Sequence, residues 1–163
     1  MIVVLLNILL IFVKYKHNHK HKMRINVGIP VKNLSDEHLR AEEAEIAMCP
    51  GFYNKVWKGK SVIPSQFTLN KGHISFFMNK KTWTLKRYQE LHQECIKRGF
   101  TGIKDKSERW NEWNSKEDID YVPMSKDSLI VKERIIGKIN NSTSQFHYYR
   151  KKIEKGDLID LLF

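Results

Sequence analysis

The stretch LSDEHLRAEEAEI, residues 34–46, gathers five carboxylates into thirteen residues of a chain whose formal net charge is +11. Ser35 or Asn33 can cap a helix at its start, and two acids occupy the first turn, where the helix dipole favours negative charge. We therefore predict a helix that runs to about Met48 and is ended by Cys49-Pro50-Gly51.

This predicted helix would place His38, Glu42 and Glu45 on one face, because they stand at positions i, i+4 and i+7. Such a face is either a solvated helix surface or a site at which a histidine and two carboxylates act together. The two interpretations are separated only by the rest of the sequence.

Two more long helices are predicted downstream. Apolar residues recur at helical spacing over residues 82–98, where cations in the last turn and Gly99 form a stop signal. A third helix fits Ser125 to about Ile139, whereas residues 101–120 are polar and charged and suit a surface loop or short helical turns.

The basic charge belongs to the body of the chain. Of the 29 lysines and arginines only four precede residue 23, no acid does, and 18 acids follow, so residues 23–163 still carry +7. A chain of this length is sufficient for one domain. Its basic body suggests that the protein binds a polyanion such as nucleic acid; the alternative is a basic protein without such a partner.

The first 22 residues differ from the rest. The apolar run at residues 1–13 is short for a membrane span and is a poor signal peptide. Three explanations compete: a membrane anchor, a tail, or residues that are not translated when Met23 is the true start, which we favour. The alternating histidines that follow can bind copper or nickel, although a disordered basic tail is the preferred interpretation; they are His17, His19 and His21.

Two basic segments suit nucleic acid. Arg134 and Lys138 share a face of the third predicted helix, where they would meet phosphates or simply form a solvated surface. In FHYYRKKIEK, residues 146–155, aromatic residues alternate with basic ones, so they either stack on bases or close the core. On a helix Tyr148 and Tyr149 would diverge by about 100°, leaving one buried and one exposed.

Three motifs in order resemble one family. They are RIN followed by LSDEHLRAEEAEI, then GHISFF with LKRYQELHQECIKRGF, then DYVP with the later basic residues and FHYYRKK. From about Met23 to Lys152 the chain is similar to the pyrimidine-dimer DNA glycosylase/AP lyase family, whose best-known member is a phage enzyme. The resemblance implies an all-α, compact single domain of three main helices, with an extended N-terminal segment threaded between them.

The resemblance also implies the chemistry. Members use no metal and no cofactor, and they act as monomers on double-stranded DNA that carries damaged bases or abasic sites. The α-amine of the first residue attacks C1′ at a pyrimidine dimer and forms a Schiff base, and the strand is then cleaved by β-elimination. A carboxylate on the first helix moves protons, and a nucleotide is flipped out of the stack.

By motif position, the catalytic carboxylate is Glu45 and the nucleophile position is Met23. The residues assigned to DNA binding are Arg24, His38, Glu42, Lys86, Arg87, Arg134, Lys138, Tyr148, Tyr149 and Lys151. The family-like domain would span residues 23–155, between an N-terminal extension at 1–22 and a C-terminal tail at 156–163. A DNA repair enzyme of this type would act in the cytoplasm, nucleoid or nucleus.

The chain departs from the family pattern at three positions. A threonine commonly follows the initiator methionine where this chain has Met23, and the arginine that comes next disfavours methionine removal, so the amine would be that of Met23 itself. Two arginines that usually flank the catalytic carboxylate are Ala44 and Met48. The alternative is therefore a DNA-binding or nuclease protein of the same fold without dimer-specific glycosylase chemistry.

Overall fold

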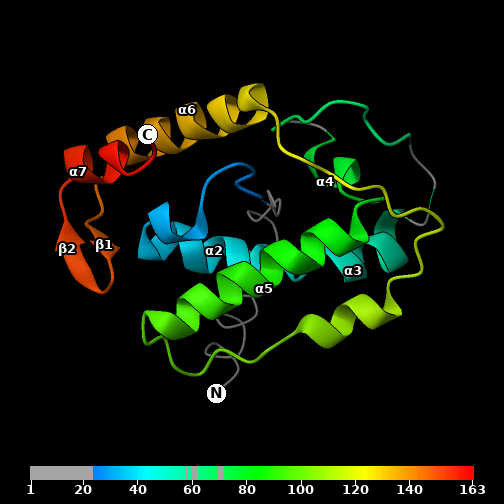
Figure 1. Cartoon of the computed structure of the whole chain (residues 1–163). Helices are drawn as coiled ribbons and strands as arrows, with labels where there is room; N and C mark the ends of the chain where they lie inside the picture. Colours follow the sequence, from blue (N-terminus) through cyan, green and yellow to red (C-terminus); the bar gives the residue numbers. More distant parts are fainter. Residues whose placement is uncertain (1–23, 58, 60–61, 70–71) are drawn as a thin grey trace, which may run out of the picture.

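Three long helices frame the computed structural model, which describes residues 24–57, 59, 62–69 and 72–163. They are α2 (Asp36–Ile46), α5 (Lys81–Lys97) and α6 (Ser125–Asn141). Each predicted helix is present with bounds within two residues of those expected. In Figure 1, α5 runs in front of α2, and α6 crosses above both.

Of the two cap candidates in the sequence, Ser35 and Asn33, the structure uses Ser35. Ser35 Oγ accepts a hydrogen bond from the backbone N–H of His38 at 3.2 Å. The predicted stop at Pro50 does not end helical structure, because α3 (Cys49–Phe52) begins there. Proline is tolerated in the first turn of a helix, where its missing N–H has no intrahelical partner anyway.

The remaining elements are short. They are the 3₁₀ helices η1 (Val31–Asn33) and η3 (Ser107–Glu112), the π-helical turn η2 (Tyr53–Trp57), α4 (His73–Phe76), β1 (Phe146–Tyr148), β2 (Lys151–Ile153) and α7 (Lys155–Asp160). The described chain is thus mostly helical, with one small two-stranded sheet.

The C-terminal region departs from the prediction in two ways. Strands β1 and β2 form an antiparallel hairpin, with Tyr148 opposite Lys151, so the two tyrosines do not lie on a helix. Instead of a tail, the last residues form α7, whose Leu158 is buried and which packs against α6.

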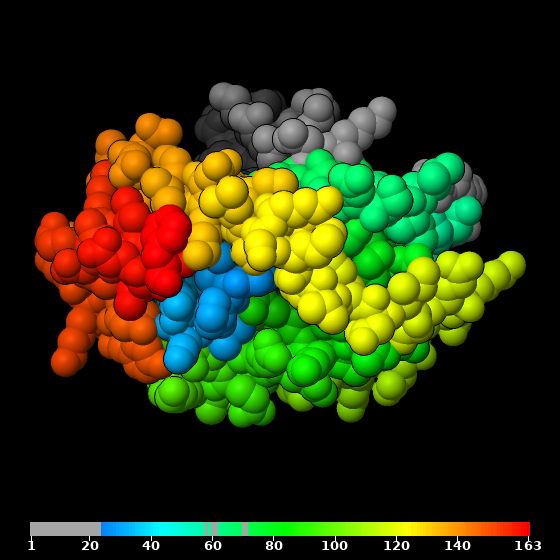
Figure 2. All heavy atoms as spheres, turned by 45° about the horizontal axis from the view of Figure 1, so that its top comes forward, coloured from blue at the N-terminus to red at the C-terminus, as the bar shows by residue number. Residues whose placement is uncertain are grey.

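The first described residues, 24–29, form a buried segment outside any helix or strand, which we call the extended segment. Ile25, Val27 and Ile29 are at most 1% exposed. A turn with Gly28 at a φ of 71° interrupts the segment, and the Ile29 N–H closes it by donating to the Asn26 carbonyl oxygen at 3.3 Å. Figure 2 shows this segment, in blue, beside the yellow and orange residues of α6. Threading of the whole N-terminal segment stays a prediction, because residues 1–23 lie outside the described part.

The core lies between α2, α5 and this extended segment. Trp110 and Trp113, which the sequence placed on a surface loop or short turns, are each 1% exposed. The Trp110 indole N–H donates to Thr84 Oγ1 at 3.0 Å, so the short helical turn η3 is anchored on α5. The described residues include no helix with the length and apolarity that a membrane crossing requires.

Candidate active site

Glu45 on α2 lies against the start of the described chain. Its Oε2 accepts a hydrogen bond from the backbone N–H of Arg24 at 2.7 Å. A small hollow of about 20 Å³, room for about one water, opens at this contact. Its lining comes from the extended segment, α2 and α6: Arg24, Asn26, His38, Ala41, Glu42, Glu45, Arg134, Ile135 and Lys138.

A buried ion pair below the hollow holds the extended segment in place. Arg87 Nε donates to Glu42 Oε1 at 2.9 Å, and its terminal nitrogens donate to the carbonyl oxygens of Ile29 and Asn26. Glu42 also accepts from the backbone and side-chain amides of Asn26, at 3.0 and 2.6 Å. Every charge in this pair is hydrogen-bonded, which is the condition under which burial of ions is tolerated.

Arg134 brings a cation from α6 to the same place. It donates to the side-chain oxygen of Asn26, and its buried Nε N–H has no hydrogen-bond partner among the described residues. Burial lowers the pKa of Arg134, while the Glu42 carboxylate opposes that shift. One turn later, Lys138 completes the positive edge of the hollow.

Burial also shifts the pKa values of Glu45 and His38 on α2. It raises the pKa of Glu45, although the Arg24 hydrogen bond and the nearby cations oppose the rise. It lowers the pKa of His38 to about 4, with Lys138 acting in the same direction. At neutral pH the histidine is therefore uncharged, whereas burial increases the affinity of the Glu45 carboxylate for a proton.

His73 also supports the site, although it was not among the residues predicted from the sequence. Its Nε2 accepts from the backbone N–H of Ile25 at 3.1 Å, so Nδ1 carries the proton and faces the Thr68 carbonyl oxygen at 2.6 Å. Burial lowers its pKa to about 4. Its signal in the sequence is only its place in the GHISFF motif, since the contact spans 48 residues.

The structure brings together six of the sequence-predicted residues around the hollow: Arg24, His38, Glu42, Glu45, Arg134 and Lys138. Met23 lies outside the described residues. Two of the residues assigned to DNA contact are buried. Arg87 and Glu42 are buried against each other, so neither presents a free polar group to a phosphate.

The other four predicted residues lie elsewhere. Lys86 is exposed on α5 and does not line the hollow. Tyr148 donates to the Lys32 carbonyl oxygen and Tyr149 to Glu94, and both rings stack on Arg98. Lys151 is exposed on β2. The tyrosines thus fasten the hairpin to the helices in this structure.

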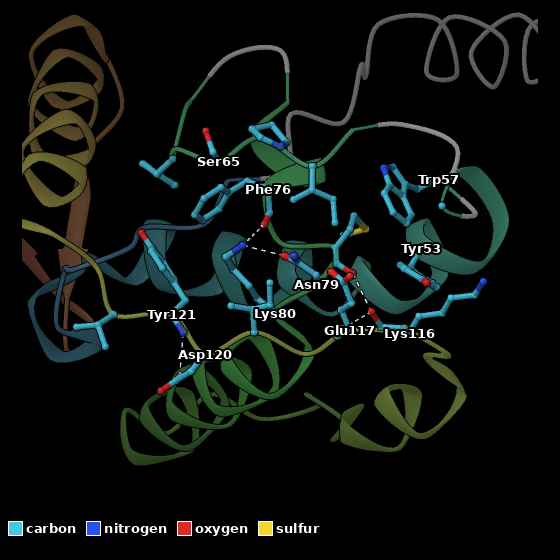
Figure 3. A pocket seen from close by; sticks show the side chains of 18 of the residues that line it. Tyr53, Trp57, Ser65, Phe76, Asn79, Lys80, Lys116, Glu117, Asp120 and Tyr121 are labelled. Carbon is cyan, nitrogen blue, oxygen red and sulfur yellow. Dashed lines mark hydrogen bonds between the residues drawn. The ribbon is translucent and has the colours of Figure 1, made fainter.

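A larger cavity, of about 900 Å³, contains none of the predicted site residues. Figure 3 shows its aromatic walls, which include Tyr53, Trp57, Phe76 and Tyr121. The buried Lys80 amine there donates to the Phe76 carbonyl oxygen and to Asn79, both at 2.8 Å. The smaller hollow differs from this cavity because it joins a partly buried carboxylate, that of Glu45, to the first of the described residues, Arg24.

The hollow can hold a proton on Glu45 and attract an anion through three cations. Among the described residues no group of three or more histidines, cysteines or acids is arranged to bind a metal ion. A family model described as pyrimidine dimer DNA glycosylase matches residues 23–108, just over half of the chain. The match begins at the residue that precedes Arg24 and spans α2 and α5.

Proposed function

The chain belongs to the pyrimidine dimer DNA glycosylase family, and on this premise we propose that it cuts damaged DNA through an amine at residue 23 and the carboxylate of Glu45. The observation that carries the proposal is the 2.7 Å hydrogen bond between Glu45 and the backbone N–H of Arg24. Along the covalent chain only two carbon atoms separate the α-nitrogen of residue 23 from the nitrogen of Arg24, which supports pairing the proposed nucleophile with Glu45.

In the proposed reaction the unprotonated amine attacks C1′ of the 5′ nucleotide of the dimer. A nitrogen–carbon bond forms, the glycosidic bond breaks, and the base keeps its bonding electrons and takes up a proton. Loss of a proton from the nitrogen and opening of the sugar ring give the Schiff base. Removal of a C2′ proton then expels the 3′ phosphate by β-elimination.

Glu45 has two parts in this sequence of steps. Its negative charge stabilises the positive charge that develops on the sugar and the imine, and burial raises its pKa, which favours its role as a proton acceptor. Arg24, Arg134 and Lys138 supply the positive edge that holds the DNA phosphates. His38 is uncharged at neutral pH and adds no repulsion to these cations.

A second candidate function is DNA binding without lyase chemistry. It is favoured by the residues beside Glu45, because Ala44 is exposed and Met48 is apolar where the family commonly has arginines. Weaker binding of the phosphates beside the lesion would give a DNA-binding or nuclease protein that has the same fold but lacks dimer-specific chemistry.

Trapping with borohydride tests the proposal, because borohydride reduces an imine to a stable amine. The protein starting at Met23 is incubated with duplex DNA that carries an abasic site or a pyrimidine dimer, and covalent complexes are separated by denaturing electrophoresis. We expect an adduct with the damaged duplexes and none with an undamaged duplex. If no adduct forms, lyase chemistry is refuted and the DNA-binding alternative stands.

A further inference from the structure

A cluster of cations lies on the side of α2 that faces away from α6. The Arg40 guanidinium carbon lies 5.0 Å from the centre of the Phe100 ring, and that of Arg150 lies 6.0 Å from the same centre. Stacking on an aromatic ring fixes the plane of a guanidinium and leaves its N–H groups at the edges, where they can reach an anion.

The backbone that carries Arg150 is strained. Tyr149 and Arg150 form the two-residue turn of the hairpin with φ of 48° and 63°. Such turns strongly favour glycine or asparagine, so two large side chains here cost free energy that the surroundings must offset. Asp36 does so by accepting from the backbone N–H of Arg150 at 2.7 Å, and the Gly99 carbonyl oxygen by accepting from its guanidinium at 2.8 Å.

This cluster adjoins the candidate active site. Arg40, Phe100 and Arg150 line a cavity of about 530 Å³ that also includes Ala41, and Ala41 borders the hollow at Glu45 as well. On its other side Arg40 borders a third cavity, of about 340 Å³, together with Ala44 and Lys104. The exposed small residues of α2 therefore form a floor between two positive edges.

Asp36 and Glu37 line the same cavity, but the side chains of the nearby acids pair with groups other than Arg40 and Lys104. Asp36 pairs with Arg98 at 2.9 Å, and Glu37 pairs with His147 at 2.9 Å. The buried Glu43 carboxylate lies 3.1 Å from His92 Nδ1 and 3.9 Å from Lys106 Nζ. Within the part of the chain that the structure describes, no carboxylate pairs with Arg40 or Lys104.

We propose that Arg40, Lys104 and Arg150 form an outer phosphate arm, which binds the sugar–phosphate backbone of duplex DNA across α2 from Arg134 and Lys138. This rests on the proposed function, because it uses the same DNA. An α-helix with its side chains is about 10–12 Å wide, so the two edges contact different phosphates. Ala44 and Met48 stand where the family commonly has arginines, and the arm replaces those missing cations. Its own cations come from α2 and from two later segments.

The salt dependence of DNA binding tests the arm. Fluorescence anisotropy of an undamaged labelled duplex is measured over a range of salt concentrations for the wild type, Arg40→Gln, Arg150→Gln, the double variant and Lys138→Ala. The plot of log K against log salt has a negative slope, and each lost phosphate contact makes that slope less steep by about 0.9. We expect a decrease of about 1 for each single arm variant and about 2 for the double variant.

Lys126→Gln, an exposed lysine in the first turn of α6, is the matched control and should keep the wild-type slope. Arg150 also bonds to Gly99, whereas Arg40 makes no such bond in the described residues, so Arg40→Gln decides the result. At saturating DNA, the rate at which Lys126→Gln cleaves an abasic site should equal that of the wild type.

The possible outcomes separate the arm from the lyase chemistry. If Lys138→Ala lowers the slope and Arg40→Gln does not, the arm is refuted and the active site is untouched. If both lower the slope but borohydride traps no adduct, the arm stands and the lyase proposal fails. Wild-type binding that does not depend on salt would refute the arm together with the DNA-binding role.

Discussion

The Glu45 carboxylate accepts a hydrogen bond of 2.7 Å from the backbone N–H of Arg24 and so joins α2 to the start of the family-like domain. A second bond does the same one turn away, because Glu42 accepts from the backbone N–H of Asn26 at 3.0 Å. Two carboxylates on one helix face thus bind successive polar groups of the extended segment. One of them is partly exposed to the hollow and the other is fully buried.

Glu45→Gln should abolish most strand cleavage on dimer-containing DNA. The amide keeps the shape of the side chain but removes the charge and the proton acceptor, a change that typically costs roughly 10²–10⁴-fold in rate. Affinity for undamaged duplex should change little. Single-turnover cleavage and anisotropy measure the two quantities.

Glu90→Gln is the control for this variant, since Glu90 is an exposed carboxylate on α5. Glu43, two residues before Glu45, is unsuitable, because it is buried and bonds to His92 at 3.1 Å. Wild-type cleavage by Glu45→Gln would show that another group moves the protons.

Protein that begins at Met23 should be more active than protein that begins at Met1. Only a free α-amine can form a Schiff base, and in the longer chain the nitrogen of residue 23 belongs to a peptide bond. Intact mass identifies each N-terminus, and the yield of borohydride adduct on abasic DNA gives the activity. Equal yields from the two proteins, with the Met1 start intact, would place the nucleophile elsewhere.

Arg87→Ala should destabilise the fold strongly. It leaves the buried Glu42 carboxylate without its cation, and breaking a buried pair in this way typically costs about 3–5 kcal/mol. Lys86→Ala, at the neighbouring exposed position, should change the unfolding free energy by no more than about 0.5 kcal/mol. Urea denaturation compares them, and similar midpoints for both variants would contradict the structural role of Arg87.

Stability should fall as the pH is lowered from about 6.5 to about 4. His38 and His73 protonate near 6.5 in the unfolded chain, but burial lowers the pKa of each to about 4 in the fold. In that window the unfolded state binds more protons, so acid favours unfolding. The full shift is worth up to about 3 kcal/mol for each histidine.

Urea midpoints at pH 7 and pH 4.5 measure this loss. His73→Gln can keep a hydrogen bond to the extended segment without titrating in this range, so its midpoint should depend less on pH than that of the wild type. A wild-type midpoint that is the same at both pH values would show that neither histidine resists protonation in the fold.

The sequence by itself determined the three long helices and the grouping of His38, Glu42 and Glu45. Periodicity, caps and stop signals act over a few residues, so the Ser35 cap and the Gly99 stop could be recognised without tertiary information. The family was recognisable for a similar reason, because its motifs keep their order along the chain.

Only the tertiary structure decided how those residues are used. Glu42 and Arg87 are 45 residues apart, and His73 and Ile25 are 48 apart, so no local pattern indicates that they meet. Arg87, which was predicted to bind DNA, is buried, and Tyr148 lies in a β-hairpin and not on a helix. Partners of this kind are chosen by burial and hydrogen bonding between distant segments, where the cost of an unpaired buried group outweighs local preference.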